Sequence, residues 1–277
     1  MDQNEEVVRL QQIAKQVRKN LLHMIFTAQS GHPGGSLSIA DIVTVLYFHE
    51  MRLNPQQPRW EDRDRFVLSK GHVCPVQYAS LAMRGFFPME ELDTLRKFGS
   101  ILQGHPDMKK TPGIDISTGS LGQGISCAVG MALACKRDRR ESRVFAVLGD
   151  GECQEGQVWE AMEAAAKYKL NNLIVFVDNN GLQLDGTCDE VMPLQDLGEK
   201  FHAFGCETSY VDGNNIEQIL QKLDQIRSSK TEKPHVIIAK TIKGKGVSFM
   251  ENICGWHGQA PNAEEYARAI EDVEAMQ

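Results

Sequence analysis

No two of the seven cysteines form a C-x-x-C pair, and their scattered positions do not suggest a disulfide framework. A structural zinc site needs closely spaced Cys or His pairs, which this sequence also lacks. In a chain of 277 residues, an odd and unpatterned set of cysteines is typical of reduced thiols, so we expect a cytoplasmic protein. Cys153 lies in a loop of interest, but no neighbouring base marks it as a nucleophile.

The chain also lacks an excess of positive charge, a long apolar run and any internal repeat. Its 30 Lys and Arg residues are outnumbered by 37 Asp and Glu, and the net charge of −7 argues against nucleic acid or an anionic membrane as a partner. No apolar stretch approaches the length of a membrane span, and the acidic residues 1–6 do not resemble a signal peptide. Without a low-complexity tract or flexible linker, residues 1–277 are predicted to form one domain.

What the sequence does contain is a strand–helix–strand pattern over residues 144–182. Two short apolar runs, residues 144–148 and 173–177, flank a segment with Val158 and Met162 at helical spacing. Branched and aromatic runs on either side of one helix predict a βαβ unit, whose two strands lie parallel. The predicted fold class is therefore α/β, with a mostly parallel central sheet flanked by helices.

Both predicted strands end in polar residues that could bind a metal. Asp150 follows the first strand, between Gly149 and Gly151, and Asn180 follows the second. Because the carboxyl ends of parallel strands open at one edge of the sheet, we expect the two side chains to lie close together. One carboxylate and one amide oxygen suit Mg²⁺ or Ca²⁺ whose other positions are filled by phosphate oxygens, waters and a backbone carbonyl. The alternative is that both segments are ordinary turns.

The remaining patterns complete an α/β chain. Strands are predicted at residues 65–68, 206–211 and 235–239, and helices at residues 5–28, 39–48, 76–84, 89–97, 125–135, 197–204, 216–227 and 263–276. Residues 30–36 are predicted to form a compact loop, with Ser36 or Ser38 as the cap of the helix that follows.

Four of the eight histidines, His32, His72, His105 and His257, lie in turns that contain glycine. Imidazole donates and accepts hydrogen bonds and titrates near neutrality, which suits the recognition of hydroxyl groups and diphosphate. The glycines of residues 118–124 would allow the close approach of a ring or of a neighbouring helix. Taken one at a time, these turns are equally well explained by packing.

Taken together, these segments resemble the thiamine diphosphate enzymes, and among them the amino-terminal, diphosphate-binding half of transketolase. The resemblance covers nearly the whole chain, in the family's order, through SGHPGGS, LSKGHVCPVQYA, GHPD, STGSLGQG, GDGECQEG, DNNGL, AKTIKGKG and WHGQAPN. Deoxyxylulose-phosphate synthase looks less similar around His72 and His257. The alpha chains of oxo-acid dehydrogenases share little with this sequence beyond the GDG and NN motifs.

The resemblance implies that residues 1–277 form a transketolase N-terminal domain that binds thiamine diphosphate through a divalent metal, Mg²⁺ or Ca²⁺. The implied metal ligands are Asp150, Asn180 and the backbone oxygen of Leu182. The implied cofactor contacts are His72, Gly119, Ser120, Leu121, Asp150, Gly151, Asn180, Lys243 and His257.

Four residues receive catalytic roles from the same resemblance. His32, His105 and His257 would bond the hydroxyl groups of a sugar phosphate and assist proton transfers. Glu155 would reach the dimer interface, beside the glutamate that activates the cofactor. That glutamate belongs to a pyrimidine-binding domain, which the resemblance does not cover. We therefore expect a partner, a C-terminal transketolase subunit, in an α2β2 heterotetramer.

The implied activity is transfer of a two-carbon ketol unit from a ketose phosphate to an aldose phosphate, with pentose phosphates as the default substrates. Two positions depart from the family: Gly35, where some relatives carry a Ser, and Gln259, where some place a substrate-facing Lys. A catalytically silent cofactor-binding or regulatory homologue is the alternative. A metal-dependent phosphohydrolase is a second, although the extra carboxylates that hold two metals are missing.

Overall fold

All five strands of the central sheet run parallel, in the order β1-β2-β3-β5-β4. The computed structural model describes residues 3–276. Its strands are β1 (Arg65–Leu68), β2 (Val144–Gly149), β3 (Leu173–Asn179), β4 (Glu207–Asp212) and β5 (His235–Lys240). The predicted α/β fold with a mostly parallel sheet is confirmed, and each strand lies close to its predicted bounds.

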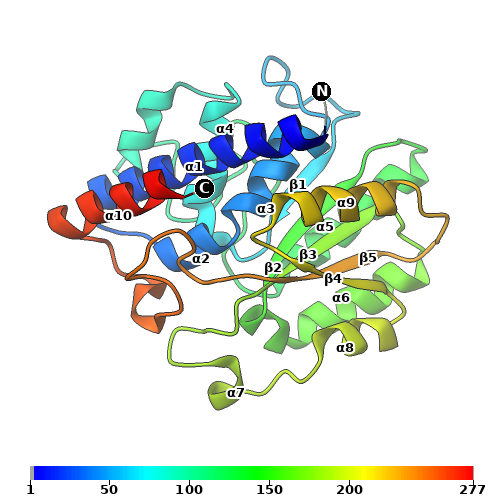
Figure 1. Ribbon diagram of the computed structural model, residues 1–277. Coiled ribbons are helices and arrows are strands. Elements are labelled where there is room, and N and C mark those ends of the chain that lie inside the picture. The colour runs from blue at the N-terminus through cyan, green and yellow to red at the C-terminus, as the bar shows by residue number, and fades with distance from the viewer. Residues whose placement is uncertain (1–2, 277) are drawn as a thin grey trace.

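Helices cover both faces of the sheet (Figure 1). One side carries α1 (Gln3–Ala28), α3 (Ala40–Val45), α4 (Cys74–Met83), α9 (Ile216–Arg227) and α10 (Ala263–Ala275), and the other carries α5 (Gln123–Arg137), α6 (Gly156–Lys167) and α8 (Leu197–Ala203). Two short helices, α2 (Pro33–Ser38) and α7 (Cys188–Val191), lie in connecting segments. Short segments of π or 3₁₀ helix are η1 (Leu46–Glu50), η2 (Gly71–Val73), η3 (Met89–Thr94), η4 (Gly151–Gln154) and η5 (Cys254–His257).

Alternate residues of each strand enter two separate hydrophobic cores. In β2, Phe145 and Val147 pack on the side of α1 and α3, whereas Ala146 and Leu148 pack on the side of α5 and α6. Successive side chains of a strand point to opposite faces, and here both faces are covered. The strands of such a sheet are therefore apolar throughout instead of alternating with polar residues.

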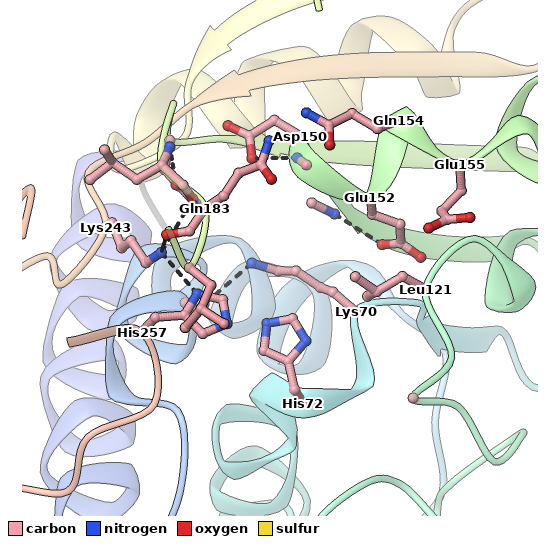
Figure 2. Close-up of a pocket in the computed structure, with 17 residues that line it drawn as sticks. Lys70, His72, Leu121, Asp150, Glu152, Gln154, Glu155, Gln183, Lys243 and His257 are labelled. Carbon is pink, nitrogen blue, oxygen red and sulfur yellow. Dashed lines mark hydrogen bonds between the residues drawn. The ribbon is translucent and has the colours of Figure 1, made fainter. Parts of the chain in front are cut away.

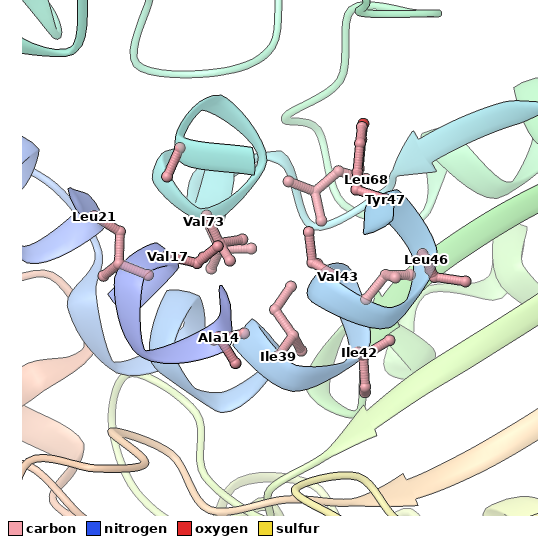
Figure 3. Packing of buried hydrophobic residues seen from close by; sticks show 14 of the residues in the cluster. Ala14, Val17, Leu21, Ile39, Ile42, Val43, Leu46, Tyr47, Leu68 and Val73 are labelled. Atoms are coloured by element: carbon pink, nitrogen blue, oxygen red, sulfur yellow. The ribbon is translucent and has the colours of Figure 1, made fainter. Parts of the chain in front are cut away.

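The larger core also anchors a turn that belongs to the functional site. Val17 of α1, Val43 of α3 and Leu68 of β1 pack in one buried cluster with Val73 of η2 (Figure 3). Fully burying an aliphatic side chain of this size stabilises a fold by about 1.5–3 kcal/mol. Packing of Val73 therefore fixes the short turn that presents His72 at the end of β1.

Residues 33–38 differ from the prediction. They form the helix α2 instead of a loop, and Ser36 and Ser38 lie inside it instead of capping the next helix. Pro33 occupies the first turn of α2. Backbone N–H groups in that turn have no partner within the helix, so the N–H that proline lacks costs no hydrogen bond. The hydroxyl of Ser36 donates to the carbonyl oxygen of His32 at 2.6 Å, so the short helix satisfies its own polar groups.

Two other predicted helices are altered. The helix predicted at residues 39–48 is divided into α3 and the π-helical turn η1. The helix predicted at residues 89–97 is the 3₁₀ segment η3, which ends before Arg96 because that residue has a positive φ of 61°. Within residues 3–276 no helix is long and apolar enough to cross a membrane. The seven cysteines are free thiols, as expected.

Candidate functional site

A pocket of about 420 Å³ opens at the carboxyl ends of β1, β2, β3 and β5. Gly149 pairs with Asp178 and Asn179 with Lys240, so these strands end side by side and the loops after them meet. Figure 2 shows the side chains that point into this space. The lining residues are Gly35, Lys70, His72, Gly119, Leu121, Gly149, Asp150, Gly151, Glu152, Gln154, Glu155, Asn180, Leu182, Gln183, Leu184, Lys243 and His257.

Most of the site residues named from the sequence line this one pocket. His32 and His105 are not among the lining residues but are linked to it by ring and backbone contacts, described below. Ser120 is exposed and does not line the pocket. The structure thus brings the predicted residues together, and their individual roles stay predictions.

The two polar residues at the ends of β2 and β3 lie close together, as expected. The Asp150 carboxylate accepts the backbone N–H of Gly151 at 2.8 Å and that of Gly181 at 2.6 Å. Burial raises the pKa of Asp150 to about 6, and repulsion from Asp178 acts in the same direction. A buried carboxylate in this state is stabilised by a nearby cation.

The orientation of the Asn180 amide is set by two further contacts. Its Nδ2 donates to the Asp178 carboxylate at 2.8 Å, and its Oδ1 accepts the backbone N–H of Leu182 at 3.1 Å. The amide oxygen therefore faces the loop that follows β3, and the amide nitrogen faces the protein interior. Among residues 3–276 no group of three or more His, Cys, Asp or Glu is arranged to hold a metal. The donor set therefore fits a divalent cation only if a ligand such as diphosphate supplies further oxygens.

Lys243 lies against the backbone oxygen that was predicted to bind metal. Its Nζ donates to the carbonyl oxygen of Leu182 at 3.2 Å and to that of Gln183 at 3.0 Å, and lies 3.0 Å from Nδ1 of His257 (Figure 2). Burial lowers the pKa of Lys243, and the charge of Lys70 adds to the effect. Lys243 forms no ion pair within the described residues, and a buried ammonium group in this state favours an anionic ligand such as diphosphate.

Three imidazoles form a cluster beside the pocket. The ring of His32 lies edge-on to those of His72 and His257, with centroids 5.0 and 5.5 Å apart, and His72 stacks on His257 at 5.2 Å. Burial lowers the pKa of His72 to about 2 and that of His32 and His257 to about 4, so all three are neutral near pH 7. Nδ1 of His32 is buried without a hydrogen-bond partner in the described part of the chain. Buried polar atoms without a partner are uncommon in folded proteins, and a bound ligand or water would satisfy this one.

His105 approaches the site from a separate loop. A side chain at Gly119 would lie 2.8 Å from Cδ2 of His105, and Gly119 has a φ of +147°, which side chains rarely allow. The glycine-rich segment therefore does admit a ring, that of His105. Burial lowers the pKa of His105, and the charge of Arg96 contributes.

Sequence reasoning missed a group of charged residues at the floor of the pocket, where Lys70 and Glu152 line it. Lys70 and Asp178 form a buried ion pair, and Glu152 accepts hydrogen bonds from the backbone N–H groups of Gly122 at 2.9 Å and Gly149 at 3.1 Å. The available signal was a charged residue placed directly after an apolar strand. Such a residue is rarely buried unless it is paired.

The structure also gives the positions of the other residues discussed from the sequence. Glu155 is exposed at the rim of the pocket. Cys153 is buried, and burial raises the pKa of its thiol far above the ordinary value, which argues against a nucleophilic role, as the sequence does. Gly35 lines the pocket, whereas the hydroxyl of Ser36 is used inside α2 and does not replace the missing serine. Gln259 is exposed.

Known proteins resemble this chain in two size classes. It is 44% identical to a 6-deoxy-6-sulfo-D-fructose transketolase subunit of Clostridium sp. (strain MSTE9), covering 98% of both chains. It is 42% identical to an apulose-4-phosphate transketolase subunit of Phocaeicola vulgatus, covering 97% of this chain and 95% of that one. The transketolase of Homo sapiens is 43% identical, but this chain covers only 40% of its length.

Solved structures agree with these sequence relatives. The transketolase of Campylobacter jejuni superposes with a TM-score of 0.90 at 34% identity, over 96% of this chain and 42% of that one. The family model for the thiamine diphosphate binding domain of transketolase matches residues 10–273. The resemblance seen in the motifs is thereby confirmed over almost the whole sequence, and the chain belongs to the family of transketolase thiamine diphosphate-binding domains.

Proposed function

We propose that this chain is the diphosphate-binding subunit of a split transketolase. It transfers a two-carbon ketol unit from a ketose phosphate to an aldose phosphate, together with a partner subunit that carries the pyrimidine-binding domain. The observation that carries the proposal is the site at the ends of β2 and β3, in a chain that spans two-fifths of complete transketolases but 98% of one named transketolase subunit.

Asp150, Asn180 and the carbonyl oxygen of Leu182 hold the divalent metal, Mg²⁺ or Ca²⁺, in this proposal. The N–H groups of Gly151 and Gly181 fix the Asp150 carboxylate, and Asp178 fixes the Asn180 amide. A carbonyl oxygen has two lone pairs, so Leu182 can accept from Lys243 and still face a metal. Diphosphate oxygens complete the ligand set, as the incomplete donor set requires.

Lys70, Lys243 and His72 surround the diphosphate, and Gly119, Leu121 and His257 contact the rest of the cofactor. Ser120 is exposed outside the pocket and is left out of this set. Bound thiamine diphosphate supplies the carbon nucleophile and the electron sink that breaking the C2–C3 bond of a ketose requires. The protein's own part is to bind the cofactor, orient it and exclude water. Lys243 forms no ion pair within the described residues, so an anion at the pocket floor would stabilise its buried ammonium group, whereas Lys70 is paired with Asp178.

His32, His105 and His257 act on the substrate side. A neutral imidazole has one donor and one acceptor nitrogen, so each ring can hold a sugar hydroxyl and pass its proton. Their lowered pKa values keep them in this neutral form near pH 7. The unpartnered Nδ1 of His32 is an atom that a substrate hydroxyl would satisfy.

Glu155 contacts the partner subunit, beside the carboxylate that activates the cofactor. Its exposed position at the pocket rim supports this role. Relatives named for 6-deoxy-6-sulfo-D-fructose and for apulose 4-phosphate suggest that the sugar varies between such subunits, so pentose phosphates are one of several candidate substrates.

A coupled assay tests the proposal. The chain is supplied with thiamine diphosphate, Mg²⁺ and ribose 5-phosphate as acceptor, first alone and then with a candidate C-terminal subunit. Xylulose 5-phosphate, 6-deoxy-6-sulfofructose and apulose 4-phosphate serve as donors in parallel. We expect turnover of at least one donor by the pair and none by the chain alone. Cofactor binding by the pair without turnover of any donor would favour the catalytically silent homologue.

A further inference from the structure

A second groove lies at the amino-terminal end of β1, outside the site described above. Residues 57–60 and Arg63, which precede the strand, form one wall, and residues 108–114 form the other. None of these residues lines the pocket at the carboxyl ends of the strands. The volume of about 600 Å³ lies within the range of about 300–1,000 Å³ that is usual for small-molecule sites, so this β1 groove can hold a ligand.

The β1 groove carries positive charges that no carboxylate of its lining balances. Its lining includes Arg59, Lys109 and Lys110, all of them exposed, and no Asp or Glu. Within residues 3–276 none of these three side chains forms an ion pair, and the neighbouring Glu61 and Asp62 are paired with another arginine. In a chain with a net charge of −7, this local concentration of positive charge favours an anionic ligand.

Arg63 gives the groove a guanidinium that is held in place. The residue is 9% exposed, its Nε donates to the carbonyl oxygen of Pro58 at 2.7 Å, and its Nη1 lies 2.5 Å from the Asp115 carboxylate. Nη2 takes part in neither contact, so it can donate to a ligand with little further loss of side-chain freedom. Because Asp115 balances the charge of Arg63, the attraction for an anion comes from the three exposed cations.

The same groove has an aromatic wall. The Trp60 side chain is 37% exposed, and the neighbouring Met108 is 43% exposed. Among the described residues no other ring and no cation stacks on this indole, whereas Trp159 and Trp256 both have ring contacts. An exposed indole beside cations is the arrangement that binds a flat ring together with its phosphate groups.

Both walls are fixed by the fold. The backbone N–H of Trp60 donates to the carbonyl oxygen of Gln57 at 2.9 Å, and that of Thr111 donates to the carbonyl oxygen of Asp107 at 2.9 Å. Gly113 has a φ of +87°, and a β carbon there would lie 2.5 Å from a methyl group of Leu81, so this turn packs closely against α4. A groove between two ordered turns is formed before a ligand arrives, which reduces the cost of binding.

We propose that the β1 groove binds a small phosphorylated compound with an aromatic ring, of the nucleotide class. The phosphate groups contact Arg59, Lys109 and Lys110, and the ring stacks on Trp60. This ligand is separate from the cofactor and substrate of the proposed function, because its site shares no lining residue with the first pocket. A small ligand is favoured over nucleic acid, since the chain as a whole is acidic.

The phosphate contacts are tested by calorimetry with ADP as the probe, at low salt and without divalent metal. The charge variant is Lys109→Gln/Lys110→Gln. The matched control is Lys230→Gln/Lys233→Gln, which removes two charges from an exposed loop. We expect saturable binding to the wild type, at least about tenfold weaker binding to the charge variant and unchanged binding to the control. No saturable binding of ADP to the wild type, or equal losses in the two variants, would overturn the inference.

The ring contact is tested with Trp60→Leu and with inorganic pyrophosphate as a second probe. Trp60→Leu should weaken ADP binding by about tenfold and leave the affinity for pyrophosphate unchanged, because only ADP has a ring to stack. Retained pyrophosphate binding also shows that the groove is still folded. Should Trp60→Leu not fold, Trp60→Gln replaces it, because a polar side chain suits a position that is partly exposed. Wild-type affinity for ADP in the folded variant would reject the stacking role and with it the ligand class.

Two further measurements place the ligand. Lys243→Met alters the first pocket and should leave ADP binding unchanged, so a loss of ADP affinity in this variant would assign ADP to the first pocket and overturn the inference. A short single-stranded DNA oligonucleotide should bind more weakly than ADP. Tighter binding of the oligonucleotide, lost in Lys109→Gln/Lys110→Gln, would assign the groove to nucleic acid instead.

Discussion

Lys70 and Asp178 form a buried ion pair that joins the carboxyl ends of β1 and β3 across β2. Lys70 is 3% exposed and Asp178 is fully buried. The Asp178 carboxylate also accepts hydrogen bonds from Oγ of Ser38 at 2.6 Å and from Nδ2 of Asn180 at 2.8 Å. A buried charge is tolerated when it is paired and its remaining lone pairs are hydrogen-bonded. The pair therefore connects the loop that carries Asn180 to the helix α2 beneath the pocket.

Breaking this pair should destabilise the fold. Asp178→Ala is expected to lower the free energy of unfolding by about 3–5 kcal/mol, because it leaves the buried Lys70 ammonium without its carboxylate partner. The double variant Lys70→Met/Asp178→Leu should recover part of the loss. Urea unfolding followed by circular dichroism measures both. In the exposed pair Lys169–Glu232, Glu232→Ala is the control and should change little, because solvent screens that pair. Equal losses in the single and double variants would contradict this account.

The metal assignment is tested by Asp150→Ala. This change should abolish Mg²⁺-dependent binding of thiamine diphosphate to the complete complex and leave the fold intact. Loss of the charged ligand from a site with few others should weaken binding by on the order of several kcal/mol. Titration calorimetry with and without Mg²⁺ gives the affinity, and Glu271→Gln on the exposed face of α10 is the control. An unchanged affinity in Asp150→Ala would remove Asp150 from the proposed ligand set.

The histidines should separate into substrate and cofactor roles. His32→Ala and His105→Ala should reduce turnover by about 10²–10³-fold with little change in cofactor affinity, because each removes a hydrogen bond to the reacting sugar. His257→Ala should reduce both, because His257 also contacts Lys243 at the pocket floor. Steady-state kinetics and calorimetry distinguish the outcomes, with the exposed His202→Ala as control. Wild-type turnover in both His32→Ala and His105→Ala would show that their predicted roles are wrong.

The buried histidines should lower the stability of the chain as the pH drops from about 6.5 towards 4, whereas Asp150, whose pKa is raised to about 6, acts in the opposite direction below that pH. The pKa of His72 is lowered to about 2 and that of His32 to about 4, so between these values and the ordinary pKa the unfolded state binds more protons. Stability then rises with pH in this window, by at most about 1.4 kcal/mol per pH unit for each histidine. His72→Gln should make the dependence shallower, whereas His202→Gln should not. Urea midpoints at a series of pH values provide the measurement, and parallel curves for His72→Gln and the wild type would refute the expectation.

Assembly with a partner should complete the cofactor site. The chain alone should bind thiamine diphosphate weakly and self-associate, because Glu155 and the start of α6 lie exposed at the pocket rim. Mixed with the C-terminal subunit, it should form an α2β2 heterotetramer with a higher cofactor affinity. Sedimentation velocity gives the mass and calorimetry the affinity. Equal cofactor affinity with and without the partner would indicate that this chain holds the whole cofactor site.

Local patterns were sufficient for most secondary structure. The bounds of β1 and of α9 coincide with their predictions, because a short apolar run and a 3.6-residue apolar period each identify one element. The segment at residues 33–38 was misjudged, because Pro33 can begin a helix as well as a loop, and burial of the whole segment selects the helix.

The sequence by itself determined that Asp150 and Asn180 would meet, because two parallel strands joined by one helix end at the same edge of a sheet. Only the tertiary structure decided which side chains contact each other there. The pairing of Lys70 with Asp178, the contact of Lys243 with the Leu182 carbonyl and the hydrogen bond from Arg96 to Ser30 join segments far apart in the chain. Such contacts depend on the direction of each side chain and on how its helix or strand packs, and no local pattern of residues records either.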